Sequence, residues 1–444
     1  MEASSTANEQ TALLGEDRLC RHGEERQECA GGGDEQDAKD NRLITTCRLA
    51  AAYYSFVVVG AWDGSYGSLV VYLRESYSLS YLTVSFALLA PVVGYTISAF
   101  LTSTIHNRLG YRGIALIASG CHCIAAFSAG LNPPYPLLVV IFMLAGLGNG
   151  IADASWNSWI GSMPRGNGLM GLLHGFYGIG AACSPALAAV LLERAGLNWT
   201  MFYRLLGVVS LLELFVVSMA FWGAGSKAAK SEAAEPHASS SIFQTFGYPS
   251  TWIISMFVFL YAATEISLAD WISSYLIDVR GFGRPTGNSL TAGYWIGLTL
   301  GRVVVGFLAS RMDWGKATVT GCSILCYFAC FFFVLVSDTG LCALGIAMIG
   351  FFLGPLFPEA VVMQARLLPK QIQLAAIGFA VAFGSAGGSV GPFLVGIAAD
   401  QQGIVVLQWF VLGMLGGCVL CWLALPRPDV KDSAYKEADN RTDL

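Results

Sequence analysis

The stretch Gly60-Ala61-Trp62-Asp63-Gly64-Ser65-Tyr66-Gly67 places a carboxylate inside an apolar run, residues 49–73, that is long enough to cross a bilayer. A carboxylate at that depth costs about 2.5–3.5 kcal/mol on insertion scales, so such groups are rare and usually face a cavity or a partner charge. Further charges lie in other apolar stretches, at Asp153, Glu213, Glu265, Asp270, Arg302 and Glu359. The sequence therefore predicts a membrane protein built around a water-accessible polar path.

Composition excludes an ordinary soluble domain. The chain has 444 residues, of which 55% are hydrophobic and 12% charged, whereas soluble domains carry about 25% charge. Its 51 glycines suit closely packed membrane helices. No phosphate-binding loop and no hydrolase or metalloprotease motif appears in the sequence. We expect neither an enzyme nor ATP-driven transport, no cofactor, and no nucleic-acid partner.

Apolar windows of membrane-spanning length follow one another along the chain. They predict an all-α membrane protein with twelve transmembrane helices in two pseudo-symmetric six-helix bundles. Residues 1–47 are expected to be a disordered cytoplasmic tail, 48–222 the first bundle, 223–250 a cytoplasmic linker, 251–425 the second bundle, and 426–444 a second tail. The helices are predicted at 48–73, 81–105, 113–131, 136–160, 169–192, 202–222, 251–277, 288–310, 316–336, 341–364, 373–400 and 404–425.

The distribution of lysine and arginine predicts the orientation. With both tails in the cytoplasm, the inner loops contain Arg108, Arg112, Arg165, Lys227, Lys230, Arg311, Lys316, Arg366 and Lys370. The outer loops contain only Arg74, Arg194, Arg280 and Arg284. Both termini are therefore expected inside, and we expect a monomer, in the plasma membrane rather than in the vacuole or another organelle.

The two halves also match each other at a nearly fixed offset. Asn107-Arg108 corresponds to Ser310-Arg311, and Gly175-Phe176 to Gly378-Phe379, in both cases 203 residues later. Asp63 and Glu265 lie 202 residues apart, each in the first helix of its half. Such repeats occur in transporters whose site lies at the repeat interface near the midplane.

These features resemble the major facilitator superfamily. Its loop after the second helix usually reads G-x3-D-R-x-G-R-R, and this chain has Ser103-x3-Asn107-Arg108-Leu109-Gly110-Tyr111-Arg112. Within the superfamily the chain resembles the fucose/galactose/glucose–proton symporter family and its fungal members. That resemblance lies in Asp63-Gly64, in residues 145–157, in residues 168–180 and in residues 350–358.

The resemblance implies roles for particular residues. In the sugar symporters, acids in helices 1 and 4 take part in proton coupling and sugar binding, and they match Asp63 and Asp153. Because Glu265 repeats Asp63, we expect it to take part as well. The loop motif implies that Arg108 and Arg112 form a cytoplasmic gate, and the internal repeat adds Arg311. Asn107 replaces the usual aspartate, so this gate needs other partners.

Physical arguments support a polar cavity around the two aspartates. Burial disfavours the charged form of a carboxyl group, so a buried acid can bind and release a proton near neutral pH. Asn149, Asp153 and Asn157 are spaced by four residues and share one helix face; the alternative is a hydrogen-bonded seam between helices. The expected solute-binding residues are Trp62, Asn149, Trp156, Asn157 and Glu359.

Other buried charges leave alternatives open. Glu213 and Arg302 are either functional or paired between helices, and Asp270 is expected at a solvated position near the membrane edge. The sequence predicts a secondary active transporter that moves a small polar or sugar-like solute by alternating access, coupled to protons. Proton-driven export of an organic metabolite or drug is the alternative, and a non-transporting sensor with the same fold is a third possibility.

Overall fold

The computed structural model describes residues 42–161, 163, 166–224, 242–312 and 315–426. The chain divides into two compact units, residues 1–51 and 52–444, and every candidate site residue belongs to the second. Most of the predicted N-terminal tail and linker, and nearly all of the C-terminal tail, lie outside the described residues. Within the described residues every regular element is helical, as expected for a chain that must satisfy its backbone hydrogen bonds inside lipid.

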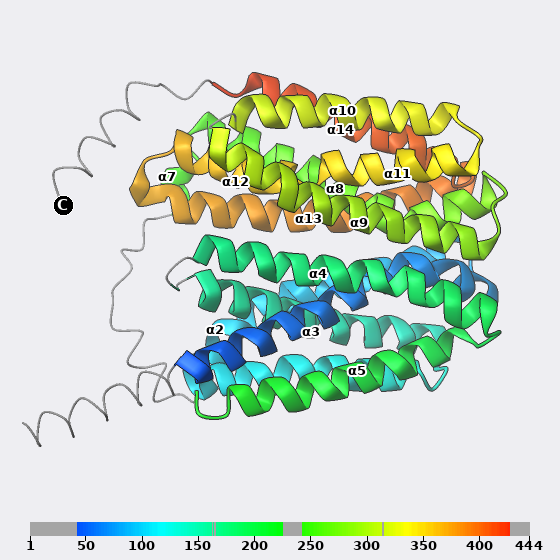
Figure 1. Ribbon diagram of the computed structural model, residues 1–444, viewed down its shortest axis with the longest axis horizontal. Coiled ribbons are helices and arrows are strands. Elements are labelled where there is room, and N and C mark those ends of the chain that lie inside the picture. The colour runs from blue at the N-terminus through cyan, green and yellow to red at the C-terminus, as the bar shows by residue number, and fades with distance from the viewer. Residues whose placement is uncertain (1–41, 162, 164–165, 225–241, 313–314, 427–444) are drawn as a thin grey trace, which may run out of the picture. The chain divides into compact units, whose positions relative to one another are not determined.

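The first half contains five long helical segments (Figure 1). They are the helix Arg42–Tyr77, α2 (Tyr81–Ala129), α3 (Tyr135–Gly161), α4 (Gly166–Ala188), which continues as the π-helix η1 (Ala189–Arg194), and α5 (Trp199–Ala220). The prediction of two helices at 81–105 and 113–131 corresponds to α2, which breaks only at Gly110 (φ 67°, ψ −165°). Glycine adopts this positive φ without steric cost, so one residue is enough for the break.

The second half contains α7 (Ile242–Thr245), α8 (Pro249–Asp278), α9 (Arg284–Met312), α10 (Gly315–Leu335), α11 (Thr339–Leu353), α12 (Leu356–Leu367), α13 (Lys370–Gln402) and α14 (Val406–Ala424). The single helix predicted at 341–364 corresponds to α11 and α12, which meet at Gly354-Pro355 within one span, Thr339–Leu367. Proline has no N–H for the helical hydrogen-bond ladder. Nine helices in the described part of the chain are long and apolar enough to cross a membrane, and Val319–Leu335 is a shorter apolar helix.

The helices pack in two groups that follow the two halves of the sequence (Figure 1). In the first group α2 packs against α3 and α5, and in the second α8 packs against α13 and α14 while α9 packs against α11. The groups meet where α4 contacts α9 and where α2 contacts α13. Functional side chains from both halves can therefore meet along this junction.

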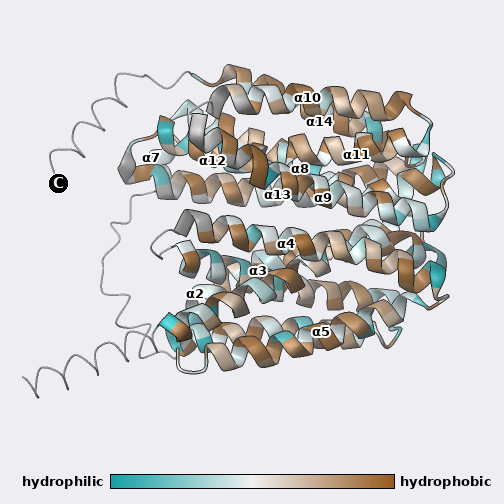
Figure 2. Ribbon diagram, in the orientation of Figure 1, coloured by the Kyte–Doolittle hydropathy of each residue, from teal (hydrophilic) through white to brown (hydrophobic). Residues whose placement is uncertain are grey.

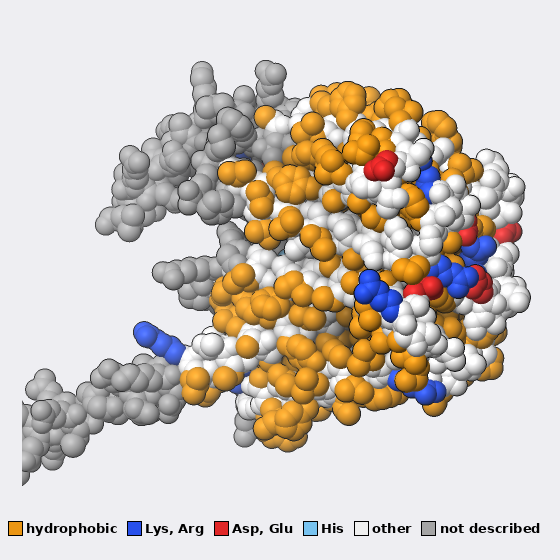
Figure 3. All heavy atoms as spheres, turned by 45° about the vertical axis from the view of Figure 1, so that its right-hand side comes forward, with side chains coloured by type: hydrophobic (Ala, Val, Ile, Leu, Met, Phe, Trp, Pro, Cys, Tyr) orange, Lys and Arg blue, Asp and Glu red, His pale blue; other side chains and the backbone are white. Residues whose placement is uncertain are grey.

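The outer surface of the helices is apolar. Figure 2 shows hydrophobic residues along the helices and hydrophilic ones mostly towards their ends. Large apolar side chains such as Phe100 and Leu131, each 77% exposed, would be costly in water and are suited to lipid. Figure 3 shows charged side chains gathered towards one end of the molecule, beyond a mainly hydrophobic flank.

Candidate functional site

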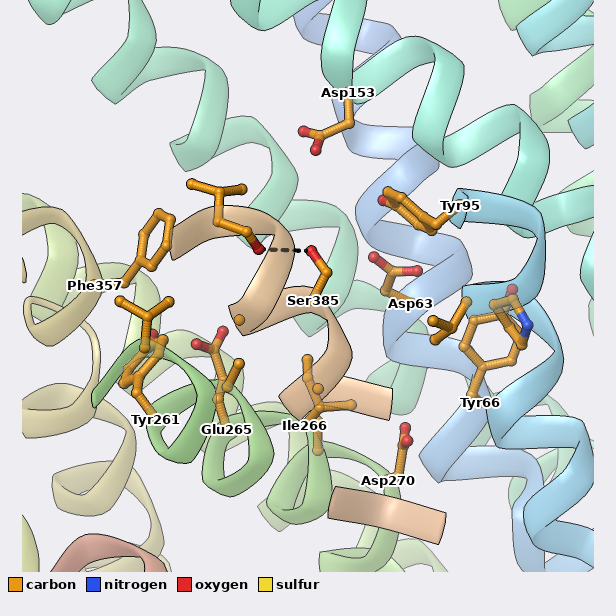
Figure 4. Close-up of a pocket in the computed structure, with 18 of the residues that line it drawn as sticks. Asp63, Tyr66, Tyr95, Asp153, Tyr261, Glu265, Ile266, Asp270, Phe357 and Ser385 are labelled. Atoms are coloured by element: carbon orange, nitrogen blue, oxygen red, sulfur yellow. Dashed lines mark hydrogen bonds between the residues drawn. The ribbon is translucent and has the colours of Figure 1, made fainter. Parts of the chain in front are cut away.

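A cavity of about 310 Å³ lies between the two halves and is shown in Figure 4. The helix Arg42–Tyr77, α2 and α3 line it from the first half, and α8, α9, α12 and α13 line it from the second. Its size is at the lower end of the range typical of small-molecule sites. Four acidic residues contribute to its wall: Asp63, Asp153, Glu265 and Asp270.

Asp63 is held by two neutral donors. The Asn149 side-chain amide donates to Asp63 Oδ1 at 2.8 Å, and the Tyr177 hydroxyl donates to Asp63 Oδ2 at 3.0 Å. Asn149 is fully buried and supports the carboxyl group from behind, without lining the cavity itself. Tyr177 comes from α4, and the sequence interpretation did not include it. The pair of donors fixes the direction in which Asp63 faces the cavity.

Asp153 also has an amide partner. Asn157 Nδ2 donates to Asp153 Oδ1 at 2.7 Å and to the Asp153 carbonyl oxygen at 2.8 Å, one helical turn earlier. The predicted stripe on α3 is therefore divided between two acids, because Asn149 serves Asp63 and Asn157 serves Asp153. Of the three residues in the stripe, only Asp153 lines the cavity.

The acid from the second half is paired with a cation. Arg302 on α9 donates to Glu265 Oε1 at 2.7 Å and to the Tyr261 hydroxyl at 3.1 Å. All three side chains line the cavity. Arg302 is thus joined to a neighbouring helix and also faces the cavity, which combines the two alternatives considered for it.

Asp270 lies in the cavity wall, and its expected solvated position near the membrane edge is wrong. Its side chain is only 5% exposed. It follows Val258, Ala262 and Ile266 at four-residue intervals, and all of these line the cavity. This spacing, which keeps residues on one side of a helix, is the signal that could have identified Asp270 from the sequence.

The two tryptophans expected to contact the solute lie elsewhere. Trp62 and Trp156 are fully buried and do not line the cavity. Trp62 packs against the rings of Phe142 and Tyr203, whereas Trp156 packs against Phe221. Because consecutive helical residues point about 100° apart, the neighbour of a cavity-facing acid need not face the cavity.

Glu359 is 9% exposed in the first turn of α12. It lies two residues beyond Phe357, which lines the cavity, but is not itself in the wall.

The predicted gate residues have different surroundings. Arg108 is exposed, and the side chain of Arg311 lies outside the described part of the chain. Arg112 stacks on the Trp222 ring, with its guanidinium carbon 3.6 Å from the ring centre. Its backbone N–H donates to the Ala224 carbonyl. The end of this loop is therefore held against the segment after α5 by a cation–π contact.

Charge pairs between the two halves occur at the opposite end of the helices. Arg74 Nη1 lies 3.0 Å from Asp278 Oδ2, and Arg284 pairs with Glu75. Tyr81 donates to Asp278 Oδ2 at 2.5 Å. We call this set the clasp: Arg74, Glu75, Tyr81, Asp278 and Arg284. The sequence interpretation did not identify the clasp.

Comparison with known proteins gives consistent matches. The family model described as Major Facilitator Superfamily matches residues 52–358 and, in a second overlapping match, 289–442. The curated relatives include "Bypass of stop codon protein 6" of Saccharomyces cerevisiae, which is 27% identical over 86% of this chain and 83% of its own length. The glucose/mannose transporter GlcP of Bacillus subtilis is 23% identical over 80% of this chain and 88% of its own.

A solved structure shares the fold. The crystal structure of the nucleoside transporter NupG superposes with a TM-score of 0.69 at 15% identity, covering 85% of this chain and 98% of that one. The resemblance seen in the sequence motifs is confirmed by these matches.

Proposed function

The chain belongs to the Major Facilitator Superfamily, whose model matches most of its length, and we propose that it moves a small solute across the membrane by alternating access coupled to protons. It is a transporter of this superfamily and not an enzyme. One observation carries the proposal: acidic side chains from both halves line a single cavity at the junction of the halves. Two-domain transporters place their sites in this position, and rocking of one half against the other exposes the site alternately to each side.

The proposed architecture is twelve membrane-spanning helices in two six-helix bundles. Nine candidate spans are counted in the described part of the chain. Division of α2 at Gly110 gives one more crossing, and α9 and α10 supply the other two. An even number of crossings places both termini on one side, and the lysine and arginine distribution favours the cytoplasm. A monomer in the plasma membrane completes this proposal.

Asp63, Asp153 and Glu265 are the proposed proton-coupling residues. Asp63 and Asp153 have neutral donors as partners, so each can be neutral or ionised without breaking an ion pair. Glu265 is paired with Arg302 at 2.7 Å, and a proton on Glu265 would release this guanidinium for another contact. Proton binding would thereby change the contacts between helices that line the cavity.

The solute is proposed to be small, and two classes remain from the sequence. Similarity to the glucose/mannose transporter GlcP favours a sugar or sugar-like solute. The cavity wall favours an amphipathic organic metabolite, because none of the lining residues that the structure describes is Asn or Gln, while Tyr66, Tyr95, Tyr261, Trp295 and Phe357 contribute rings. A non-transporting sensor is the third possibility. A sugar-like solute or an organic metabolite would be moved across the membrane, whereas a sensor would only bind its ligand.

Reconstituted proteoliposomes test the proposal. Uptake of a solute panel that includes glucose, mannose and organic amines should increase when a pH gradient is imposed. Asp153→Asn should abolish accumulation driven by the gradient while leaving the protein folded, since the amide keeps the size of the side chain and removes its titration. The matched control is Asp338→Asn, since Asp338 caps α11 outside the cavity and Asn is also a good cap.

Gradient-driven accumulation at the wild-type level in Asp153→Asn would show that the proton binds elsewhere. Failure of the whole panel to cross, with folded protein, would favour the sensor.

A further inference from the structure

The charges that line the cavity do not balance. Four carboxyl groups face it, and the only cation among the described lining residues is Arg302. Arg302 is already paired with Glu265. Asp63, Asp153 and Asp270 therefore share the cavity without a basic side chain of their own. A buried carboxyl group without a basic partner is either neutralised by a proton or paired with a positive group. A cation that enters the cavity would supply such a group.

Asp270 is the least satisfied of these acids. Asp63 receives two hydrogen bonds and Asp153 receives one, but the described residues provide no hydrogen-bond or ion-pair partner for Asp270, although it is 95% buried. In Figure 4 its carboxyl group is directed towards the side of the cavity where Asp63 and Tyr66 lie. A ligand that brings positive charge to Asp270 would supply the partner that the protein does not provide.

The rest of the wall is suited to a cation with an apolar body. Tyr95, Tyr261, Trp295 and Phe357 line the cavity together with aliphatic side chains. Aromatic faces attract cations, and cages of such rings recognise quaternary ammonium groups. A neutral polyol needs a paired donor or acceptor for each hydroxyl. Apart from the acids, Arg302 and the Tyr and Trp polar atoms, Ser385 is the single hydrogen-bonding side chain among the described lining residues.

We propose that the transported solute is an organic cation, with an amine or quaternary ammonium group bound between Asp270 and Asp63 and an apolar part packed against the aromatic wall. This inference rests on the proposed function, because it names the solute class of the same cavity. Asp63 belongs to the first half and Asp270 to the second, so a bound cation would be attracted to both halves at once. Its binding would favour the arrangement that brings the two acids towards each other.

The experiment measures binding to the purified full-length protein in lipid nanodiscs. Phenyltrimethylammonium is the probe, because its charge does not depend on pH. Benzyl alcohol and glucose are the neutral comparisons. Calorimetry should show phenyltrimethylammonium binding at least tenfold more tightly than benzyl alcohol, with no binding of glucose at the same concentrations.

Variants locate the charge contact. Asp270→Asn should weaken phenyltrimethylammonium binding tenfold or more, and Asp270→Glu should restore part of the affinity because it keeps the charge. Asp338→Asn removes a carboxyl group outside the cavity and should bind as the wild type does. The comparison of probes uses the wild-type protein, so the test stands even if an Asp270 variant fails to fold.

Tighter binding of glucose than of phenyltrimethylammonium, or an unchanged affinity in folded Asp270→Asn, would overturn the inference. These outcomes are separate from those for the proposed function. Gradient-driven glucose uptake without cation binding would support proton-coupled transport and contradict the inference that the solute is a cation. Cation binding without any gradient-driven transport would support the cation site and contradict proton-coupled transport.

Discussion

Glu213 is fully buried, and each of its carboxylate oxygens has a partner. Oε1 accepts from the Ser55 hydroxyl at 2.7 Å, and Oε2 lies 2.9 Å from His122 Nδ1. Trp156 Nε1 donates to the Ser55 oxygen at 3.2 Å. The four side chains come from the helix Arg42–Tyr77, α2, α3 and α5. Glu213 thus takes the helix-pairing alternative, and it joins four helices of the first half.

We expect Glu213→Ala to lower the thermal stability of the purified protein. The change leaves Ser55 and His122 without their shared acceptor, and each buried polar group left without a partner costs about 1–3 kcal/mol. Thermal unfolding in detergent, followed by tryptophan fluorescence, measures the loss. Glu213→Gln keeps an acceptor for Ser55 and should cost less. Equal unfolding temperatures for Glu213→Ala and the wild type would contradict a structural role.

For single residues, the sequence indicates which charges lie inside apolar helices but not where each side chain points. Asp63 and Asp153 could be expected in one cavity, because each is a charge deep inside an apolar helix, and both line it. Trp62 and Trp156 could not be placed in the same way. Rotation of each helix about its axis decides which neighbour of an acid faces the cavity, and packing between helices fixes that rotation.

At the scale of whole helices, glycine determines how closely α2 and α3 approach. A Cβ atom built on Gly146 would lie 1.9 Å from the carbonyl oxygen of Pro91, which no side chain can tolerate without movement of the backbone. Small residues at helix crossings allow this close packing in membranes. Pro91 also lines the cavity, so the α2–α3 crossing supports part of its wall.

We expect Gly146→Ala to destabilise the protein by about 1–3 kcal/mol, because it overpacks this crossing. Gly120 on α2 is the matched control, since a Cβ there has no atom within 4 Å. Gly120→Ala should be neutral or slightly stabilising, because alanine favours the helix by up to about 1 kcal/mol. Thermal unfolding of the two variants side by side is the measurement. Equal stability of the two variants would show that the crossing relaxes without cost.

The positions of the helices were easier to predict than their breaks. Apolar runs of membrane length identified most helices to within a few residues, for example 404–425 against α14 (Val406–Ala424). The breaks depend on single residues. Gly110 divides α2 into the two predicted helices, whereas α11 and α12 join at Gly354-Pro355 within one span, Thr339–Leu367. Hydropathy averages over windows and does not register such local changes of backbone direction.

At the scale of the molecule, the clasp joins the two halves at one end of the cavity. Arg74 and Glu75 lie in the last turn of the helix Arg42–Tyr77, and Asp278 ends α8, the first membrane-length helix of the second half. The internal repeat makes these helix ends equivalent, with Arg74 and Asp278 204 residues apart. The repeat alone did not predict their pairing, because contact between halves depends on how the bundles tilt. If the tails lie in the cytoplasm, as proposed, the clasp lies at the outer end of the molecule.

The last prediction concerns the balance between the two states. The Arg74 and Asp278 side chains are 22% and 34% exposed, and an exposed ion pair contributes about 0–1 kcal/mol. Asp278→Arg replaces this attraction with repulsion from Arg74 and also removes the acceptor of Tyr81. A change of about 1.4 kcal/mol shifts a two-state ratio tenfold. We therefore expect Asp278→Arg to open this end in a large fraction of molecules.

Spin labels at the exposed positions Leu131 and Val279, one in each half, would report the opening as a longer distance between them. The double variant Arg74→Asp with Asp278→Arg restores an opposite-charge pair in reversed order and should return the distance distribution towards that of the wild type. A shorter distance between the labels in the double variant than in Asp278→Arg would identify the Arg74–Asp278 pair itself as the contact that holds the halves together. If both variants open to the same extent, the hydrogen bond from Tyr81 to Asp278, which both variants lose, holds this end instead. If neither variant opens, the Glu75–Arg284 pair, which both variants keep, holds it.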